Sequence, residues 1–286
     1  MKNILKLELK KALTNKFFIL SAIILFLPTM MSLMYNVEIN MIAVNETKEL
    51  TDAGYVYDTM PDAATIFNNW VGGEAYSLGS TIFFYIFPLM LAIPYGWSYC
   101  SELKSGYIKN MVIRTKRMPY FLSKYIAVFV ASGLVVIIPM ILNIMLTACY
   151  LPAMTPSSQW AIYTGVFSQS FMSQLYYTVP FLYLFIYLLI DFIFCGLIGC
   201  LSFAVTHLIK NRVVVVIFPF AVLLLWQYLA NNIEHSLEIS LAPTEFMHPA
   251  TAGYVAVWSV IIIEGIILFA ATFLPTIIKG RKYEIY

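Results

Sequence analysis

The chain has 286 residues, of which 61% are hydrophobic and 11% charged, and its formal net charge is +2. Soluble domains carry about a quarter of their residues as charges, so this composition excludes an ordinary soluble protein. It predicts a membrane protein. The acids and bases gather in different segments, so the net charge does not indicate a nucleic-acid partner.

Six apolar runs are long enough to cross a bilayer. A spanning helix needs about 20 apolar residues, since the hydrocarbon core is roughly 30 Å thick and a helix rises about 1.5 Å per residue. We therefore predict an all-α polytopic membrane protein, with one transmembrane domain over residues 1–286. The predicted spans are residues 17–35, 79–99, 120–150, 178–208, 213–230 and 254–278.

The lysines and arginines lie almost entirely on one side of these spans. Of the 17 basic residues, all but Lys48 fall before the first span, after the second, after the fourth or after the sixth. The positive-inside rule assigns that side to the cytoplasm. We therefore expect a multi-pass protein of the cell membrane with both termini in the cytoplasm.

Three further segments lie outside the predicted spans. Residues 1–16 have apolar positions at helical spacing among lysines, which predicts an interfacial helix attracted to anionic membrane lipid. Residues 36–78 form an outer segment long enough to be a small cap. Residues 231–253 form another, in which short apolar pieces followed by prolines predict a re-entrant stretch.

Two carboxyl groups fall at membrane depth, Asp191 in the fourth predicted span and Glu264 in the sixth. No cation is predicted at that depth, so each should face the bundle interior or water, or bond to polar residues such as Asn143 or Gln227. Two interpretations stay open. These four residues line a translocation path, or they make polar contacts between helices.

The sequence contains no motif for catalysis. It has no phosphate-binding loop of the Walker type, no zinc-protease motif and no hydrolase nucleophile motif. Its four cysteines have no ligand-like spacing. We therefore expect no catalytic residue, bound metal or cofactor on this chain. Work on a solute would draw its energy from a partner or from an ion gradient.

The segment at residues 100–118 is the largest polar interruption between apolar runs. Tyr107 and Met111 recur at helical spacing, which predicts a short amphipathic helix at the cytoplasmic surface. Pro119 disfavours helical geometry at the residue before it, so we expect a break at Met118.

This segment carries a pattern seen in a known family. Its parts are a Glu-x-x-x-Gly pair (Glu102, Gly106), a basic cluster (Arg114, Lys116, Arg117) and an apolar-Ser-Lys start to the third span (Leu122, Ser123, Lys124). With six spans and cytoplasmic termini, the chain resembles the type-2 ATP-binding-cassette (ABC) transporter permease family.

The resemblance implies that residues 100–118 form a coupling helix, which docks on a separate cytoplasmic ABC ATPase subunit. It implies two ATPase copies, which hold ATP and Mg, and a second permease subunit in a homodimer or heterodimer. This chain would then be non-catalytic. Glu102 and Gly106 would shape the helix start, and the expected contacts with the ATPase are Tyr107, Ile108, Met111 and Arg114.

The long outer segments and the many Met, Phe and Tyr residues resemble permeases of Gram-positive bacteria that export amphipathic, antimicrobial or toxin peptides. Two other functions stay open. One is an ion-gradient-driven carrier that uses Asp191 and Glu264. The other is a non-transport sensor or assembly protein of the membrane, whose insert binds lipid or another protein.

Overall fold

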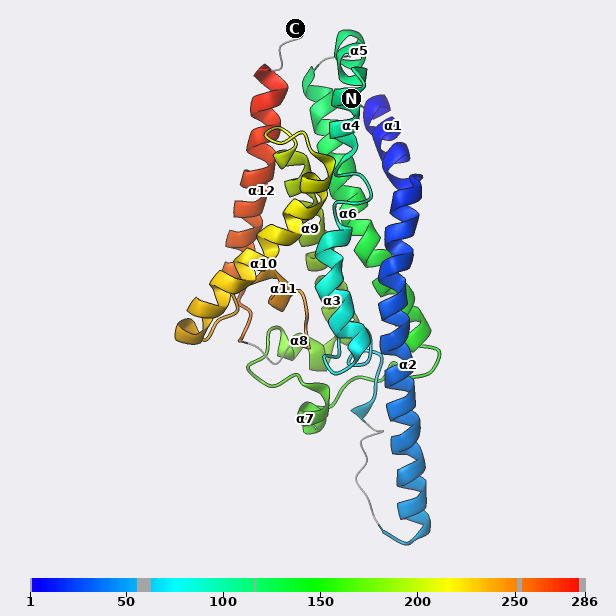
Figure 1. Ribbon diagram of the computed structural model, residues 1–286. Helices are drawn as coiled ribbons and strands as arrows, with labels where there is room; N and C mark the ends of the chain where they lie inside the picture. Colours follow the sequence, from blue (N-terminus) through cyan, green and yellow to red (C-terminus); the bar gives the residue numbers. More distant parts are fainter. Residues whose placement is uncertain (1, 56–62, 116, 251–253, 283–286) are drawn as a thin grey trace.

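The computed structural model describes residues 2–55, 63–115, 117–250 and 254–282, and helices dominate that part of the chain (Figure 1). An isolated bridge between Ile239 and Val255 accompanies them. Five of the helices are long and apolar enough to span a membrane. They are α2 (Lys16–Asp52), α6 (Arg117–Thr147), α9 (Pro180–Val205), α10 (Arg212–Leu237) and α12 (Trp258–Lys282). The prediction of an all-helical, multi-pass membrane protein is confirmed at this level.

The predicted span at residues 79–99 has a different form. Helix α3 (Leu78–Met90) has 13 residues and is followed by turns up to α4 (Ser98–Lys104). Pro94 lies in those turns, and proline has no backbone N–H to continue a helix. At about 1.5 Å per residue, α3 alone is roughly 20 Å long and shorter than a hydrocarbon core.

Helix α2 is longer than its predicted span and continues through residues 36–52 of the predicted outer segment. In Figure 1 its far half extends away from the bundle. Asn15 caps its start, since its side chain accepts a hydrogen bond from the N–H of Phe17 at 3.2 Å. Pro28 lies within the helix, which runs on past it.

Helices α6 and α9 form the centre of the bundle, and α6 also contacts α1 (Lys2–Leu13), α2 and α12. Small residues allow the close approach. A Cβ on Gly133 would lie 2.6 Å from the ring of Phe192, and one on Gly196 would lie 2.6 Å from the ring of Phe129. Such small-residue contacts are typical of helices packed within membranes.

The polar insert forms two short helices, α4 and α5 (Tyr107–Arg114). Gly106 joins them with φ 71°, a left-handed conformation that glycine adopts without strain. The break predicted at Met118 is wrong, because the extended residue is Thr115 and α6 begins at Arg117. Pro119 therefore lies in the first turn of α6, where its missing N–H removes no helical bond.

The remaining helices and turns lie at two opposite ends of the bundle (Figure 1). We call the end with α1, α4 and α5 the basic end. We call the other the acidic end, since it includes the far half of α2 with Glu38, Glu46, Glu49 and Asp52. The acidic end also contains residues 63–77, η2 (Ser158–Trp160), α7 (Ala161–Thr164), α8 (Ser173–Thr178) and α11 (Pro243–Phe246).

Candidate functional site

A buried group of charges lies at the basic end, and we call it the ion cluster: Glu8, Lys11, Tyr95, Glu102, Tyr107, Tyr120 and Lys124. Its centre is the ammonium of Lys124, which is fully buried. This nitrogen lies 3.1 Å from Oε2 of Glu8 and 2.8 Å from Oε1 of Glu102. One cation therefore joins two acids from helices that are distant in the sequence.

Two tyrosines complete the bonding of the carboxylates. The hydroxyl of Tyr95 donates to Oε2 of Glu8 at 2.7 Å and accepts from Lys124 at 3.1 Å. The hydroxyl of Tyr120 donates to Oε2 of Glu102 at 2.5 Å. Burial alone would raise the pKa of Glu8, but Lys124, Tyr95 and Lys11 outweigh burial and lower that pKa, so Glu8 stays ionised.

Lys11 connects the ion cluster to the insert. Its ammonium lies 3.4 Å from Glu8 and 3.7 Å from Glu102, and it donates to the hydroxyl of Tyr107 at 3.1 Å. The same ammonium lies 4.4 Å from the centre of the Tyr107 ring, a cation–π distance. The Lys11 side chain is 38% exposed, so solvent screens these contacts more than those of Lys124.

The ion cluster links five parts of the chain. Glu8 and Lys11 come from α1, Tyr95 from the turns after α3, and Glu102 from α4. Tyr107 opens α5, while Tyr120 and Lys124 lie in the first turns of α6. Two carboxylates face two ammonium groups. The arrangement contains no activated nucleophile, and it is suited to holding the insert, α1 and α6 in fixed register.

The residues predicted as partner contacts fall in different environments. Glu102 lies in the ion cluster and Gly106 begins α5, as the pattern implied for the helix start. Ile108 is 1% exposed and packs in the core, so it does not form a surface as predicted. Tyr107 is half-buried under Lys11, and Met111 packs against the core.

The side chain of Arg114 lies outside the described residues, although its backbone ends α5. The exposed apolar side chain of α5 is instead Ile113, which is 70% exposed. The structure shows that Ile108 and Val112 face inward, so this apolar side of α5 packs on the bundle and is not exposed as a docking surface.

Glu8, Lys11, Tyr95 and Tyr120 were missed as site residues. Glu8 offered one signal, because it is the single acid among residues 1–16 in a segment with five lysines. An acid in a basic surface helix needs no partner in water. Its burial follows from α1 packing against α6, which the sequence pattern does not reveal.

Asn143 and Gln227 were predicted as partners of the membrane carboxyls, and this pairing is wrong. Asn143 accepts from the N–H of Val71 and donates to the carbonyl of Thr29, each at 2.8 Å. Gln227 donates to Glu245 at 2.6 Å. Both amides thus satisfy polar groups at the acidic end instead.

Asp191 and Glu264 are both buried within their helices. Within the described part of the chain, three of their carboxyl oxygens have no hydrogen-bond partner. These are both oxygens of Asp191 and Oε2 of Glu264. An unpaired carboxyl group inside a bundle is costly, so these two positions need an explanation that packing alone does not give.

His248 fixes the segment after α11 against α3. Its Nε2 lies 2.9 Å from the carbonyl oxygen of Glu74 and 3.3 Å from the hydroxyl of Ser80, and its ring stacks on Phe84 at 4.0 Å. Burial lowers the pKa of His248 to about 4, although the contacts with Glu74 oppose this shift. The ring is therefore neutral near pH 7.

This burial predicts a loss of stability in acid. Between the ordinary histidine pKa of 6.5 and the folded value of about 4, the unfolded chain binds the proton that the folded chain excludes. As the pH falls from about 7 to about 5, we expect the free energy of unfolding to decrease by about 2 kcal/mol because of His248. Thermal unfolding at both pH values measures it, and His248→Gln should flatten the dependence. Equal slopes for the two proteins would contradict this assignment.

Comparison with known proteins gives no relative: no protein-family model, no curated protein and no solved structure matches the chain. Among the described residues, no three histidine, cysteine or acidic side chains gather as metal ligands would. The ion cluster and the two membrane carboxyls are therefore the features from which function is argued.

Proposed function

We propose that this chain is the permease subunit of an ATP-driven exporter and belongs to the type-2 ABC permease family. It forms the translocation pathway with a second permease subunit, and two cytoplasmic ATPase subunits bind the ATP and Mg. In this proposal the basic end and both termini face the cytoplasm. The five long apolar helices are five of the six spans, and α3 with the turns that follow it is the remaining one, second in chain order.

One observation carries the proposal. The Glu-x-x-x-Gly pair and the apolar-Ser-Lys sequence resemble two separate parts of the family pattern, and the structure joins them by the 2.8 Å contact of Glu102 with Lys124. The insert is therefore tied by charge to α6, a long span at the bundle centre. Such a tie gives a reason for both parts of the pattern to occur together.

The proposed mechanism is mechanical. ATP binding draws the two ATPase subunits together, and they displace α5, on which they dock. The ion cluster transmits this displacement to α1 and α6, because its buried contacts resist separation of those helices. The spans then change their packing and release the solute on the far side.

The proposed solute is an amphipathic peptide of the antimicrobial or toxin kind, as in Gram-positive exporters. Methionine and aromatic side chains adapt to apolar faces of different shapes, and this chain has 14 Met, 21 Phe and 20 Tyr.

The exposed side chain of Ile113 gives the test. Ile113→Asp should reduce co-purification of the ATPase subunit at least tenfold, because an aspartate would be buried unpaired in the apolar contact. The measurement is the amount of ATPase recovered with the tagged chain from membranes of its native host. The control is Ile162→Asp, a 73% exposed isoleucine of α7 at the acidic end, which should change nothing. Recovery of no ATPase even with the unaltered chain would favour a sensor or assembly protein.

A second candidate function rests on Asp191. A carboxyl group with two unpartnered oxygens in the bundle interior is a suitable proton site for an ion-gradient-driven carrier, with Glu264 as the second. Transport by proteoliposomes that contain this chain and no ATPase, abolished by Asp191→Asn, would overturn the ATP-driven proposal.

A further inference from the structure

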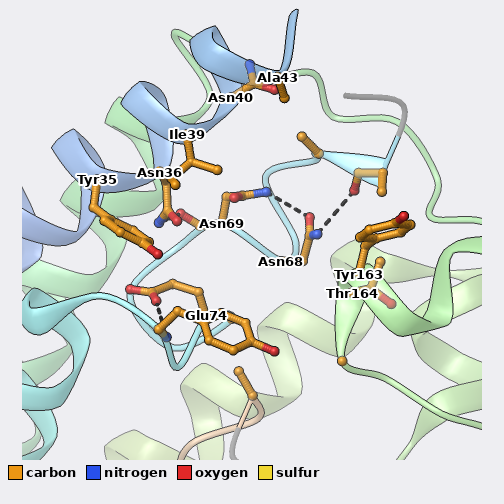
Figure 2. A pocket seen from close by; sticks show the side chains of 16 residues that line it. Tyr35, Asn36, Ile39, Asn40, Ala43, Asn68, Asn69, Glu74, Tyr163 and Thr164 are labelled. Carbon is orange, nitrogen blue, oxygen red and sulfur yellow. Dashed lines mark hydrogen bonds between the residues drawn. The ribbon is translucent and has the colours of Figure 1, made fainter. Parts of the chain in front are cut away.

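The acidic end contains a cavity of about 290 Å³ between α2, the segment of residues 63–76 and the end of α7. Figure 2 shows Tyr35 and Asn36 on one side, Tyr163 on the opposite side, and Glu74 below. The volume is small for a whole drug-sized ligand, whose sites measure about 300–1,000 Å³, and suits one chemical group of a larger molecule.

The amide groups that line this cavity present oxygen atoms. The Nδ2 of Asn36 donates to the carbonyl of Asn69 at 2.9 Å, and the Nδ2 of Asn69 donates to the carbonyl of Thr65 at 2.9 Å. These bonds to acceptors fix the orientation of both amides. No described group donates to Oδ1 of Asn36 or of Asn69, and Asn36 is only 5% exposed. An amide oxygen that lines a cavity and accepts from no described group can accept from a ligand that supplies N–H groups.

Glu74 adds negative charge without offering a bonding site. Its Oε1 accepts from the hydroxyls of Ser32 and Ser77, and its Oε2 accepts from the backbone N–H groups of Tyr76 and Ser77. These donors are neutral, so none of them is a counter-charge to the carboxylate beside the cavity. That charge favours a cation bonded to the neighbouring amide oxygens.

The surroundings of the cavity also favour a positively charged ligand. The far half of α2 carries the exposed acids Glu38, Glu46, Glu49 and Asp52, against one exposed base, Lys48. These acids attract cations toward this end, although salt screens them beyond roughly 10 Å. Tyr35 and Tyr163 place aromatic rings at the cavity wall, where they can contact an organic cation by its charge and its alkyl part.

We propose that this cavity binds the ammonium or guanidinium group of an organic cation. The amide oxygens of Asn36, Asn40 and Asn69 accept its N–H groups, Glu74 supplies the charge, and the tyrosines contact its carbon atoms. Asn40 makes no hydrogen bond within the described part of the chain, so its whole amide is available to a ligand. Binding needs no ATPase, so this site is independent of the proposed permease function.

The experiment measures equilibrium binding to the full chain in nanodiscs of zwitterionic lipid, by the anisotropy of fluorescein-labelled tetralysine. Labelled tetraserine is the uncharged control peptide. We expect tetralysine to bind and tetraserine not to bind, with an affinity that falls as salt is added. Displacement by spermidine or by unlabelled tetra-arginine then identifies a small polyamine or a peptide as the better source of the cation, and either result supports the site.

Three variants on α2 distinguish binding in the cavity from a general attraction of tetralysine to the acidic residues. Asn36→Ala and Asn40→Ala should each weaken tetralysine binding about tenfold, since each removes one acceptor to a charged donor. Asn40→Ala removes no internal hydrogen bond, so folding is not at issue there. Asn45→Ala, an exposed asparagine of the same helix, should bind as the unaltered chain does, and so should Ile113→Asp. Unchanged affinity in both cavity variants, or equal binding of tetraserine, would overturn the proposal.

Discussion

Replacing Lys124 with methionine is expected to destabilise the folded protein by about 3 to 5 kcal/mol, because it leaves Glu8 and Glu102 beside an apolar side chain. Glu8 is fully buried, so water cannot take over the role of the ammonium. The loss is measured as the fall in thermal unfolding temperature of the purified chain in detergent, at one pH and one salt concentration.

Two comparisons make this expectation specific. Lys11→Met removes the other ammonium, but Lys11 is 38% exposed and should cost less than about 1 kcal/mol. Combining Lys124→Met with Glu8→Gln and Glu102→Gln removes the charges together, and it should recover most of the stability. A Lys124→Met protein as stable as Lys11→Met would show that the ion cluster does not hold the basic end together.

Gly79→Ala should have the next largest effect, about 3 kcal/mol of lost stability, because it forces α3 away from α2. A Cβ at Gly79 would lie 2.3 Å from the backbone nitrogen of Ser32 and 2.4 Å from the carbonyl oxygen of Pro28. Both are backbone atoms, so no side-chain rotation relieves the clash. Thermal unfolding of the variant gives the measurement.

The matched control is Gly265→Ala in α12. The nearest atom to its new Cβ would be Cζ of Phe194 at 3.7 Å, an ordinary contact distance. Alanine is favoured over glycine in a helix by about 1 kcal/mol, so this variant should be as stable as the unaltered chain or slightly more stable. If both alanine variants unfolded at the same temperature, the close approach of α2 and α3 would be refuted.

The class of fold could be predicted because bilayer thickness sets the length of an apolar run. The limits of the elements could not. In the predicted second span, helix α3 ends after 13 residues and the turns that contain Pro94 follow it. In contrast, residues 36–52 contain no helix-breaking residue, and α2 continues through them. A hydropathy pattern records where a chain meets lipid, and helix ends also depend on caps, turns and packing.

The candidate site was predicted in part for a similar reason. Glu102 and Lys124 were identified as parts of one pattern, but the contact of Lys124 with Glu8 joins residues more than one hundred positions apart. The buried side of α5 could not be predicted, because Ile108 and Met111 were both expected to contact a partner and the sequence does not show whether apolar positions pack on the bundle or on a partner. Burial of Ile108 resolves this only in three dimensions.

Helix α2 is long enough that a small tilt at one of its ends becomes a large displacement at the other. Near its start, the amide of Asn15 donates to the carbonyl of Pro94 at 3.1 Å, next to the turns that carry Tyr95. Further along the same helix, Asn36 and Asn40 line the cavity of the acidic end. The distance from residue 15 to residue 40 is about 37 Å at about 1.5 Å per residue. A tilt of about 5° at the basic end would therefore shift that wall of the cavity by about 3 Å, the scale on which hydrogen bonds are made or lost.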